Sequence, residues 1–345
     1  MRVVRMRTEA GDRFELIDEH GFVDEHAASF VRGLLGRGCS PHTVVAYLYD
    51  LRRFYTFLAE SSLTLSSFKV AHSVDLLAWH GNIQSNRVRL TSFPAAIRTT
   101  LSPTSINRTM AAISSFFDHL VLADEPGIDA NPLATPQELV RGGVARRRSR
   151  GARRLKRVER LPRPMSREQV ETLLSVVDRP RDRAMTLLML QGGLRPGEVL
   201  NLHLDDIEYG RRRVTIRHRT DHPKGVRTKS RTERVIDLHE PEALAAVSRY
   251  VVAERPGSAP TRHLFLVCGG GTRADEALSY AALAKMFKRR CATAGLHEPW
   301  ITPHALRHTH ATLLWEGGMR ELALQKRLGH ASYGSTKATP GSAMP

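Results

Sequence analysis

Two short stretches in the second half of the sequence place an arginine at the start of a predicted helix. In QGGLRPGEVLNL, Arg195 follows a glycine turn and precedes a proline, and Glu198 lies one helical turn further on. In TPHALRHTHATL, Pro303 marks a helix start and puts His304 and Arg307 three positions apart on one face. Arginine suits phosphate because its planar fork donates two parallel hydrogen bonds. The two stretches therefore predict that a phosphate group is bound, provided that the fold brings them together.

Two further motifs contain residues that could act on such a group. Lys229 lies in TKSRTERVIDL, in a polar turn between two predicted strands, from which a long amine could reach into a groove. His330 follows directly on the short helix of LQKRLGHAS, which Gly329 closes. Each feature alone is typical of a solvated surface residue.

The histidines of TPHALRHTHATL could also suggest a metal site. His308 and His310 stand close to His304, but a metalloprotease helix would need two histidines four positions apart with an intervening glutamate. Arg307 sits beside His308 and would repel a cation. We therefore expect no metal at this helix.

The elements around these motifs predict a helix-rich second domain with a small antiparallel sheet. Ser166 and Gln169 form a capping-box pattern, and RDRAMTLLMLQGG predicts a buried helix that ends at Gly192. Alternating patterns over 211–218 and 233–238 predict two strands, and 262–267 could add a third. Further helices are predicted over 281–294, 303–315 and 321–328.

The region before residue 125 predicts a helical first domain of roughly four helices. Ser40 can cap a helix of about twenty residues that begins at Pro41. Pro103 marks the start of a second long amphipathic helix. A shorter helix is predicted over 73–80, and 81–101 is interpreted mainly as loop. The pattern shows no internal repeat.

A basic segment separates the two domains. Between Arg141 and Arg163 the chain carries eleven basic residues and one acid, Glu159, so this stretch cannot fold on itself. We interpret it as a solvated linker that can lie along phosphates without sequence preference. Its predicted DNA-binding residues are Arg146, Arg147, Arg148, Arg150, Arg153, Arg154, Lys156 and Arg157.

The overall charge points to a polyanion as partner. The chain has 345 residues, with 52 Lys and Arg against 35 Asp and Glu and a net charge of +17. It has no apolar run of about eighteen residues that could span a bilayer, and its three cysteines, Cys39, Cys268 and Cys291, offer neither a disulfide framework nor a metal-ligand spacing. We expect a soluble protein in the cytoplasm.

The ordered set of Arg195, Lys229, His304, Arg307 and His330 resembles the active-site set of the tyrosine recombinases, also called phage integrases. The resemblance implies a fold that is mainly α with a small antiparallel β-sheet. An N-terminal extension (1–24) would precede an all-α, SAM-like core-binding domain that clamps DNA (25–125). The basic linker (126–164) would lead to an α+β catalytic domain (165–345).

The same resemblance implies a role for each residue. Arg195 and Arg307 would clamp the phosphate, Lys229 would protonate the departing 5′ oxygen, and His304 would assist proton transfer at the nucleophile. His330 would hydrogen-bond the phosphate, and Glu198 would brace the first arginine. The implied reaction is site-specific DNA recombination or integration through a 3′-phosphotyrosine, with no cofactor. It would run in a homotetramer on double-stranded DNA, associated with the nucleoid.

The sequence departs from the family at the nucleophile. The family's tyrosine follows the LGH histidine by about nine residues, where this chain has Thr339, and Tyr333 lies too early to replace it. We therefore expect a catalytic domain that is incomplete at its C-terminus, and strand cleavage to be impaired. A frameshift near codon 338 is one explanation, since a shifted reading permits a tyrosine at position 339, and truncation is the other.

Two alternatives to an active recombinase stay open. The chain could be a non-catalytic DNA-binding remnant that occupies recombination sites. A nicking activity like that of a type IB topoisomerase uses a similar residue set, but it needs the same phenol. The target DNA sequence, and the choice between integration, excision, resolution and inversion, do not follow from the sequence.

Overall fold

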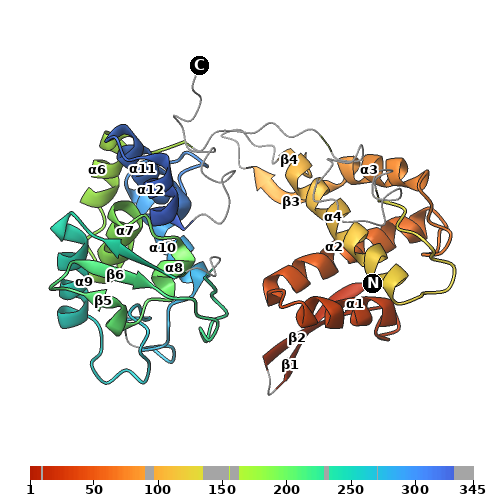
Figure 1. Cartoon of the computed structure of the whole chain (residues 1–345), viewed down its shortest axis with the longest axis horizontal. Coiled ribbons are helices and arrows are strands. Elements are labelled where there is room, and N and C mark those ends of the chain that lie inside the picture. Colours follow the sequence, from red (N-terminus) through yellow and green to blue (C-terminus); the bar gives the residue numbers. More distant parts are fainter. Residues whose placement is uncertain are drawn as a thin grey trace. The chain divides into compact units, whose positions relative to one another are not determined.

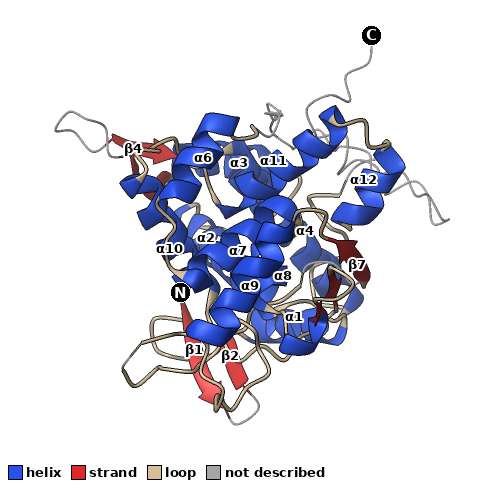
Figure 2. Ribbon diagram, turned by 90° about the vertical axis from the view of Figure 1, so that its left-hand side faces the viewer, coloured by secondary structure: helices blue, strands red, loops and turns tan. Residues whose placement is uncertain are grey.

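The computed structural model describes residues 1–8, 11–89, 97–134, 155, 163–228, 233–269 and 271–329. These residues form two compact units, Met1–Glu159 and Arg160–Pro345 (Figure 1). Helices dominate the described part of each unit, where the strands form short antiparallel pairs and one small sheet (Figure 2). The predicted fold class, mainly helical with a small antiparallel sheet, is confirmed.

In its described part, the first unit is built on four helices. They are α1 (Glu25–Gly36), α2 (Pro41–Glu60), α3 (His72–Asn82) and α4 (Pro103–Leu122). Ser40 and Ser102 cap α2 and α4 as N-cap residues, and each is followed by a proline in the first turn, as the sequence predicted for α2. The buried faces meet in an aromatic core that includes Phe30, Phe54 and Phe116.

Two hairpins add to this helical unit. Strand β1 (Arg2–Thr8) pairs with β2 (Gly11–Ile17), whose Leu16 is buried in the helical core. Strand β3 (Gln84–Arg89) pairs with β4 (Ile97–Thr100), so the prediction of a loop over 81–101 was wrong. The sequence of β3, QSNRVR, has a single apolar residue, and backbone pairing in such a polar strand leaves no alternating pattern to read.

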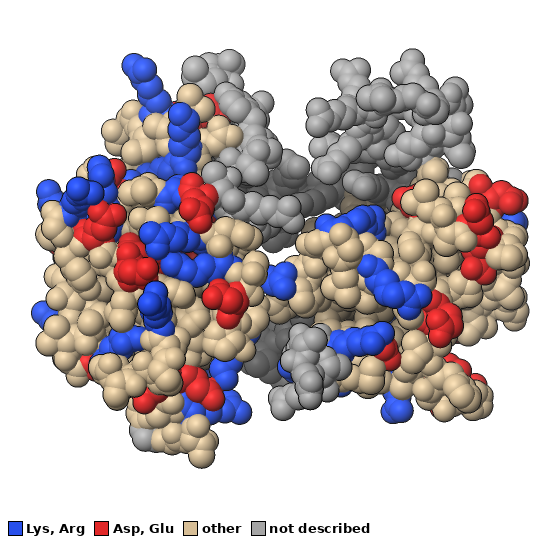
Figure 3. All heavy atoms as spheres, turned by 60° about the horizontal axis from the view of Figure 1, so that its bottom comes forward, with Lys and Arg blue, Asp and Glu red and all other residues tan. Residues whose placement is uncertain are grey.

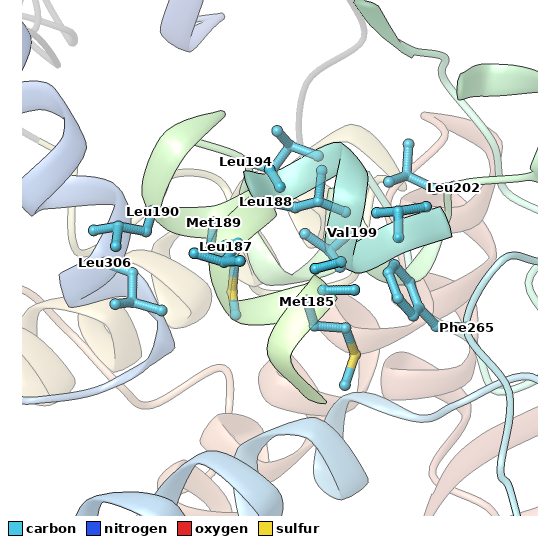
Figure 4. Close-up of a cluster of buried hydrophobic side chains, with 14 of the residues drawn as sticks. Met185, Leu187, Leu188, Met189, Leu190, Leu194, Val199, Leu202, Phe265 and Leu306 are labelled. Atoms are coloured by element: carbon cyan, nitrogen blue, oxygen red, sulfur yellow. The ribbon is translucent and has the colours of Figure 1, made fainter. Parts of the chain in front are cut away.

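The second unit is organised around one buried helix. Its helices are α6 (Arg167–Ser175), α7 (Pro180–Gln191), α8 (Pro196–Leu200), α9 (Pro241–Ala253), α10 (Tyr280–Thr293), α11 (Pro303–Glu316) and α12 (Glu321–Leu328). Helix α7 is buried from Ala184 to Leu190 and packs against α8, α9 and α11. Figure 4 shows leucine and methionine side chains of α7 packed among Val199, Phe265 and Leu306. The predicted capping box of Ser166 and Gln169 is present at α6.

A three-stranded antiparallel sheet covers one side of this unit, in the order β5 (Ile207–Glu208), β6 (Arg213–Ile216) and β7 (Arg234–Asp237). Strands β6 and β7 confirm the two predicted strands. The proposed third strand over 262–267 was wrong: this segment has only isolated bridges, and Leu264 bonds to the backbone of Leu202. A short apolar run is compatible with a buried loop as well as with a strand, so periodicity could not separate them.

The charge of the surface agrees with the composition. Lys and Arg side chains lie across the visible face of each unit, with Asp and Glu scattered among them (Figure 3). Among the described helices, none combines the length and the apolar character that a membrane span requires.

Candidate active site

Arg195 stands at the entrance of α8, as the sequence predicted. It follows the Gly192-Gly193 turn at the end of α7 and is the N-cap residue of α8. Its backbone N–H donates to Oε2 of Glu198 over 2.8 Å, and its Nη1 donates to Oε1 of the same carboxylate over 2.8 Å. Glu198 therefore fixes both the main chain and the guanidinium of Arg195.

Glu198 also binds two arginines from other elements. Its side chain has no exposed surface. Arg234, on β7, donates to Oε1 over 3.1 Å and to Oε2 over 2.8 Å, and Nη1 of Arg307, on α11, lies 3.7 Å from Oε2. Burial alone would raise the pKa of Glu198, but the three guanidiniums outweigh it and hold that pKa below its ordinary value. One carboxylate thus remains charged at the centre of three cations.

Arg307 is held by backbone carbonyls as well. Its Nη1 donates to the carbonyl of Gly193 over 2.5 Å, and its Nη2 donates to the carbonyl of Leu328. Burial, with Arg195 and Arg234 nearby, lowers the pKa of Arg307 to about 9, which still leaves the guanidinium protonated at neutral pH. The side chain is therefore a fixed cation beside the turn that carries Arg195.

The three arginines also share the C-terminal end of α12. Arg234 donates from Nε to the carbonyl of Arg327 over 2.8 Å, Arg307 binds the carbonyl of Leu328, and Arg195 donates to that of Gly329 over 3.3 Å. The last carbonyls of a helix have no partner within the helix and carry its partial negative charge, so cations are favoured there. Arg195 and Arg307 thus converge on the same carboxylate and the same helix end.

A histidine of α11 connects α12 to the end of α7. His310, on α11, pairs through Nδ1 with the carbonyl of Leu190 over 2.9 Å, and its Nε2 lies 3.1 Å from Nε of Arg327. Burial and the adjacent Arg327 lower the pKa of His310 to about 3, so the ring is neutral near pH 7. The position of this ring explains why residue 193 is a glycine. A β-carbon added at Gly193 would lie 2.3 Å from Cδ2 of His310.

The other predicted site residues are placed differently or lie outside the described residues. His304 is exposed in the first turn of α11. Lys229, His330, Tyr333 and Thr339 lie outside the described residues, as do the linker cations Arg146, Arg147, Arg148, Arg150, Arg153, Arg154, Lys156 and Arg157. The structure therefore brings together Arg195, Glu198 and Arg307 from the predicted set.

Arg234 and Arg327 were not predicted as site residues from the sequence. Arg234 appears in the sequence as one polar position of a strand, and Arg327 as a basic residue in the last turn of a helix. Neither pattern carries a signal for the contact with Glu198 or with His310, because both contacts join elements that are distant in the chain. In the described ranges, no group of three or more His, Cys, Asp or Glu side chains could hold a metal ion.

Comparison with known families identifies the chain. A model described as the phage integrase family matches residues 163–338, and the phage integrase N-terminal SAM-like domain matches residues 27–124. The chain thus has the two-part architecture of the tyrosine recombinases, in which a helical domain is followed by an α+β domain. The chain belongs to the phage integrase family.

Curated relatives span almost the whole chain. Transposase A from transposon Tn554 of Staphylococcus aureus is 27% identical over 331 residues, which cover 94% of this chain and 89% of the relative. Tyrosine recombinase XerC of Pelobacter propionicus is 29% identical over 313 residues, which cover 87% of this chain and 85% of the relative. Tyrosine recombinase XerA of Thermococcus kodakarensis is 29% identical, and the match covers 87% of this chain and 84% of the relative.

Solved structures share the fold. The Tn1549 transposon integrase in complex with a circular intermediate DNA superposes with a TM-score of 0.64 at 20% identity, covering 90% of this chain and 93% of that one. The XerH site-specific recombinase bound to palindromic difH substrate superposes with a TM-score of 0.63 at 18% identity. This match covers 88% of this chain and 77% of that one. At these identities the likeness concerns the fold.

Proposed function

We propose that this protein acts in site-specific DNA recombination, and that Arg195 and Arg307 bind the phosphodiester at which strands are exchanged. The observation that carries the proposal is the convergence of the two guanidiniums on Glu198 and on the end of α12. Arg195, at the N-cap of α8, and Arg307, on α11, supply two fixed cations to one small region. A phosphate group is the ligand that such a pair fits best.

The chemistry follows from the charge that develops during strand exchange. Attack on a phosphodiester builds negative charge on the nonbridging oxygens, and preorganised cations stabilise that charge more than they stabilise the ground state. Within the described residues, no protein group accepts a hydrogen bond from Nε of Arg195 or of Arg307. Nε of each arginine is thus the donor that we assign to a ligand oxygen.

The remaining roles are carried over from the family, residue by residue. Lys229 would protonate the departing 5′ oxygen, His304 would assist proton transfer at the nucleophile, and His330 would hydrogen-bond the phosphate. The reaction needs neither a metal nor a nucleotide, because the covalent protein-DNA bond conserves the energy of the broken strand.

Duplex DNA would contact several parts of the chain. The helical domain (25–125) would clamp the duplex, and the basic linker (126–164) would lie along its phosphates and make affinity salt-dependent. The catalytic domain (165–345) would work in a homotetramer assembled on DNA. These assignments rest on the charge distribution and on relatives whose names describe recombinases and recombinase-DNA complexes.

Strand cleavage by this chain would be impaired at the nucleophile. Thr339 occupies the position where the family has its tyrosine, and the pKa of an alcohol lies far above the phenol's value of about 10. A second candidate function follows from this residue: the chain would occupy recombination sites without cutting them.

A nicked duplex separates the two functions. Duplexes bound by the chain would be selected from a random pool, and a nick beside each phosphate in turn would trap any covalent adduct. We expect binding without an adduct for the natural chain, and an adduct for the Thr339→Tyr variant. An adduct formed by the natural chain and abolished by Tyr333→Phe would contradict the assignment of Thr339. Failure to bind any duplex would contradict the proposed function itself.

A further inference from the structure

Arg234 differs from the other two arginines in how its donors are used. Its Nη1 and Nη2 bind the two oxygens of Glu198, and its Nε binds the carbonyl of Arg327. All three nitrogens therefore donate to protein groups. Among the described residues, Arg234 thus has no nitrogen without a protein acceptor.

Arg195 and Arg307 instead leave Nε without a protein acceptor in the described part of the chain. Each also donates from Nη2 to a carbonyl at the end of α12, Gly329 for Arg195 and Leu328 for Arg307. A neutral carbonyl is a weaker acceptor for a guanidinium than a charged phosphate oxygen. An arriving phosphate would therefore compete with these carbonyls for the two arginines.

That competition would loosen α12 unless something else holds it. Gly329 ends α12 in the left-handed conformation, with φ of +60°, and its N–H bonds to the carbonyl of Lys326. His330 is the next residue in the sequence, so the end of α12 determines where the chain enters the segment of His330. Of the three arginines bound to this helix end, Arg234 is the one whose three nitrogens all donate to protein groups within the described ranges.

We propose that Arg234 is a positioning residue: it anchors Glu198 and the end of α12 as one unit, so that Arg195 and Arg307 can exchange backbone carbonyls for phosphate oxygens without displacing α12. This inference rests on the proposed function, because it assumes that Arg195 and Arg307 bind phosphate. In this inference, Arg234 of β7 keeps α12 in place while the phosphate is bound, although Arg234 itself does not contact the phosphate.

The alternative is a purely structural role, in which Arg234 only balances the charge of Glu198. The two roles differ in what DNA does to α12. If Arg234 is a structural ion pair alone, DNA should affect the end of α12 equally with and without it. If Arg234 anchors α12, DNA should loosen the helix end only when Arg234 is absent.

Amide hydrogen exchange of Gly329 measures this directly in the full chain. The Val247 amide in α9 serves as the internal reference, because that residue is fully buried in the core on a helix that contributes none of the three arginines. Arg213→Gln is the matched control: Arg213 pairs with Asp237 in the same sheet, but this ion pair is about half exposed. The probe is a duplex selected for binding from a random pool.

For Arg234→Gln we expect Gly329 exchange to rise at least about tenfold relative to Val247, since charge-assisted hydrogen bonds at the helix end are lost. Saturating DNA should raise it further in this variant, but not in the natural chain or in Arg213→Gln. Unchanged relative exchange of Gly329 in Arg234→Gln, or an equal effect of DNA on all three chains, would overturn the inference.

A second variant keeps the test decisive if Arg234→Gln does not fold. Arg234→Lys retains a cation beside Glu198, but a single amine cannot reach both Glu198 and the carbonyl of Arg327 in the same geometry. DNA should then raise Gly329 exchange in Arg234→Lys, and behaviour identical to the natural chain would overturn the inference. Absence of DNA binding by the natural chain would refute the proposed function instead, and the exchange rates without DNA would still test the anchor.

Discussion

Arg327 donates a hydrogen bond from its Nε to Nε2 of His310 over 3.1 Å. For Nε2 to accept, the proton of the neutral ring must sit on Nδ1, which then donates to the carbonyl of Leu190. A neutral imidazole therefore links α12 to the end of α7, beside the turn that carries Arg195. Protonation of His310 would remove the acceptor and place a cation against Arg327.

This arrangement predicts that the stability of the second unit depends on pH. Burial lowers the pKa of His310 to about 3, against 6.5 for the ordinary side chain, so below pH 6.5 the unfolded chain binds a proton that the folded chain does not. The free energy of unfolding should therefore fall as pH decreases from 6.5 towards 3. For His310 alone we expect a loss of about 2 kcal/mol between pH 7 and pH 5.

Urea unfolding at several pH values checks this expectation. His310→Gln should flatten the pH dependence by about 2 kcal/mol, whereas His297→Gln, at an exposed position, should leave it unchanged. His222 contributes in the same direction, because burial lowers its pKa to about 4, so some dependence should remain in His310→Gln. Identical curves for His310→Gln and the natural chain would show that the ring is not held neutral.

Removal of the charge of Glu198 should destabilise the second unit strongly. Glu198→Gln would leave the guanidiniums of Arg195, Arg234 and Arg307 close together and without their shared anion, at a cost of about 3–5 kcal/mol in the free energy of unfolding. Glu208→Gln is the control, since its pair with Arg211 is exposed and should contribute less than about 1 kcal/mol. Equal effects of the two substitutions would mean that the buried carboxylate does not hold the arginines.

A substitution at Gly193 separates steric contact from backbone strain. Gly193 has φ of +65°, and an added β-carbon would lie 2.3 Å from His310, whereas Gly225 has φ of +66° and nothing within 4 Å of that position. Gly225→Ala should cost about 1 kcal/mol, from the left-handed conformation alone. Gly193→Ala should cost at least about 2 kcal/mol more, because the His310 ring must move. Thermal unfolding of both variants measures the difference, and equal costs would contradict the close packing of Gly193 on His310.

Much of the fold could be predicted because its helices carry local signals. Ser40 with Pro41 starts α2, the glycines after Gln191 end α7, and Gly329 closes α12, so each boundary depends on residues next to it in sequence. The β3–β4 hairpin escaped prediction, because a polar strand such as QSNRVR has no apolar alternation.

The candidate site was predictable only in part. Arg195 and Arg307 lie in motifs with helix-start signals, and Glu198 is within one turn of Arg195. The roles of Arg234 and of the α12 carbonyls depend on contacts between β7, α8 and α12, and no local pattern encodes such contacts. Three-dimensional packing was needed to show that one carboxylate serves three arginines.

The affinity for a selected duplex, measured in a double-mutant cycle of Arg195→Lys and Arg307→Lys, tests the central claim most directly. Lysine keeps the charge beside Glu198 but loses the second parallel hydrogen bond, so each substitution should weaken binding about tenfold. If both arginines bind one phosphate, the double variant should bind clearly more tightly than the product of the two losses predicts. Losses that simply multiply would show that the two arginines act on separate groups, and would contradict the account.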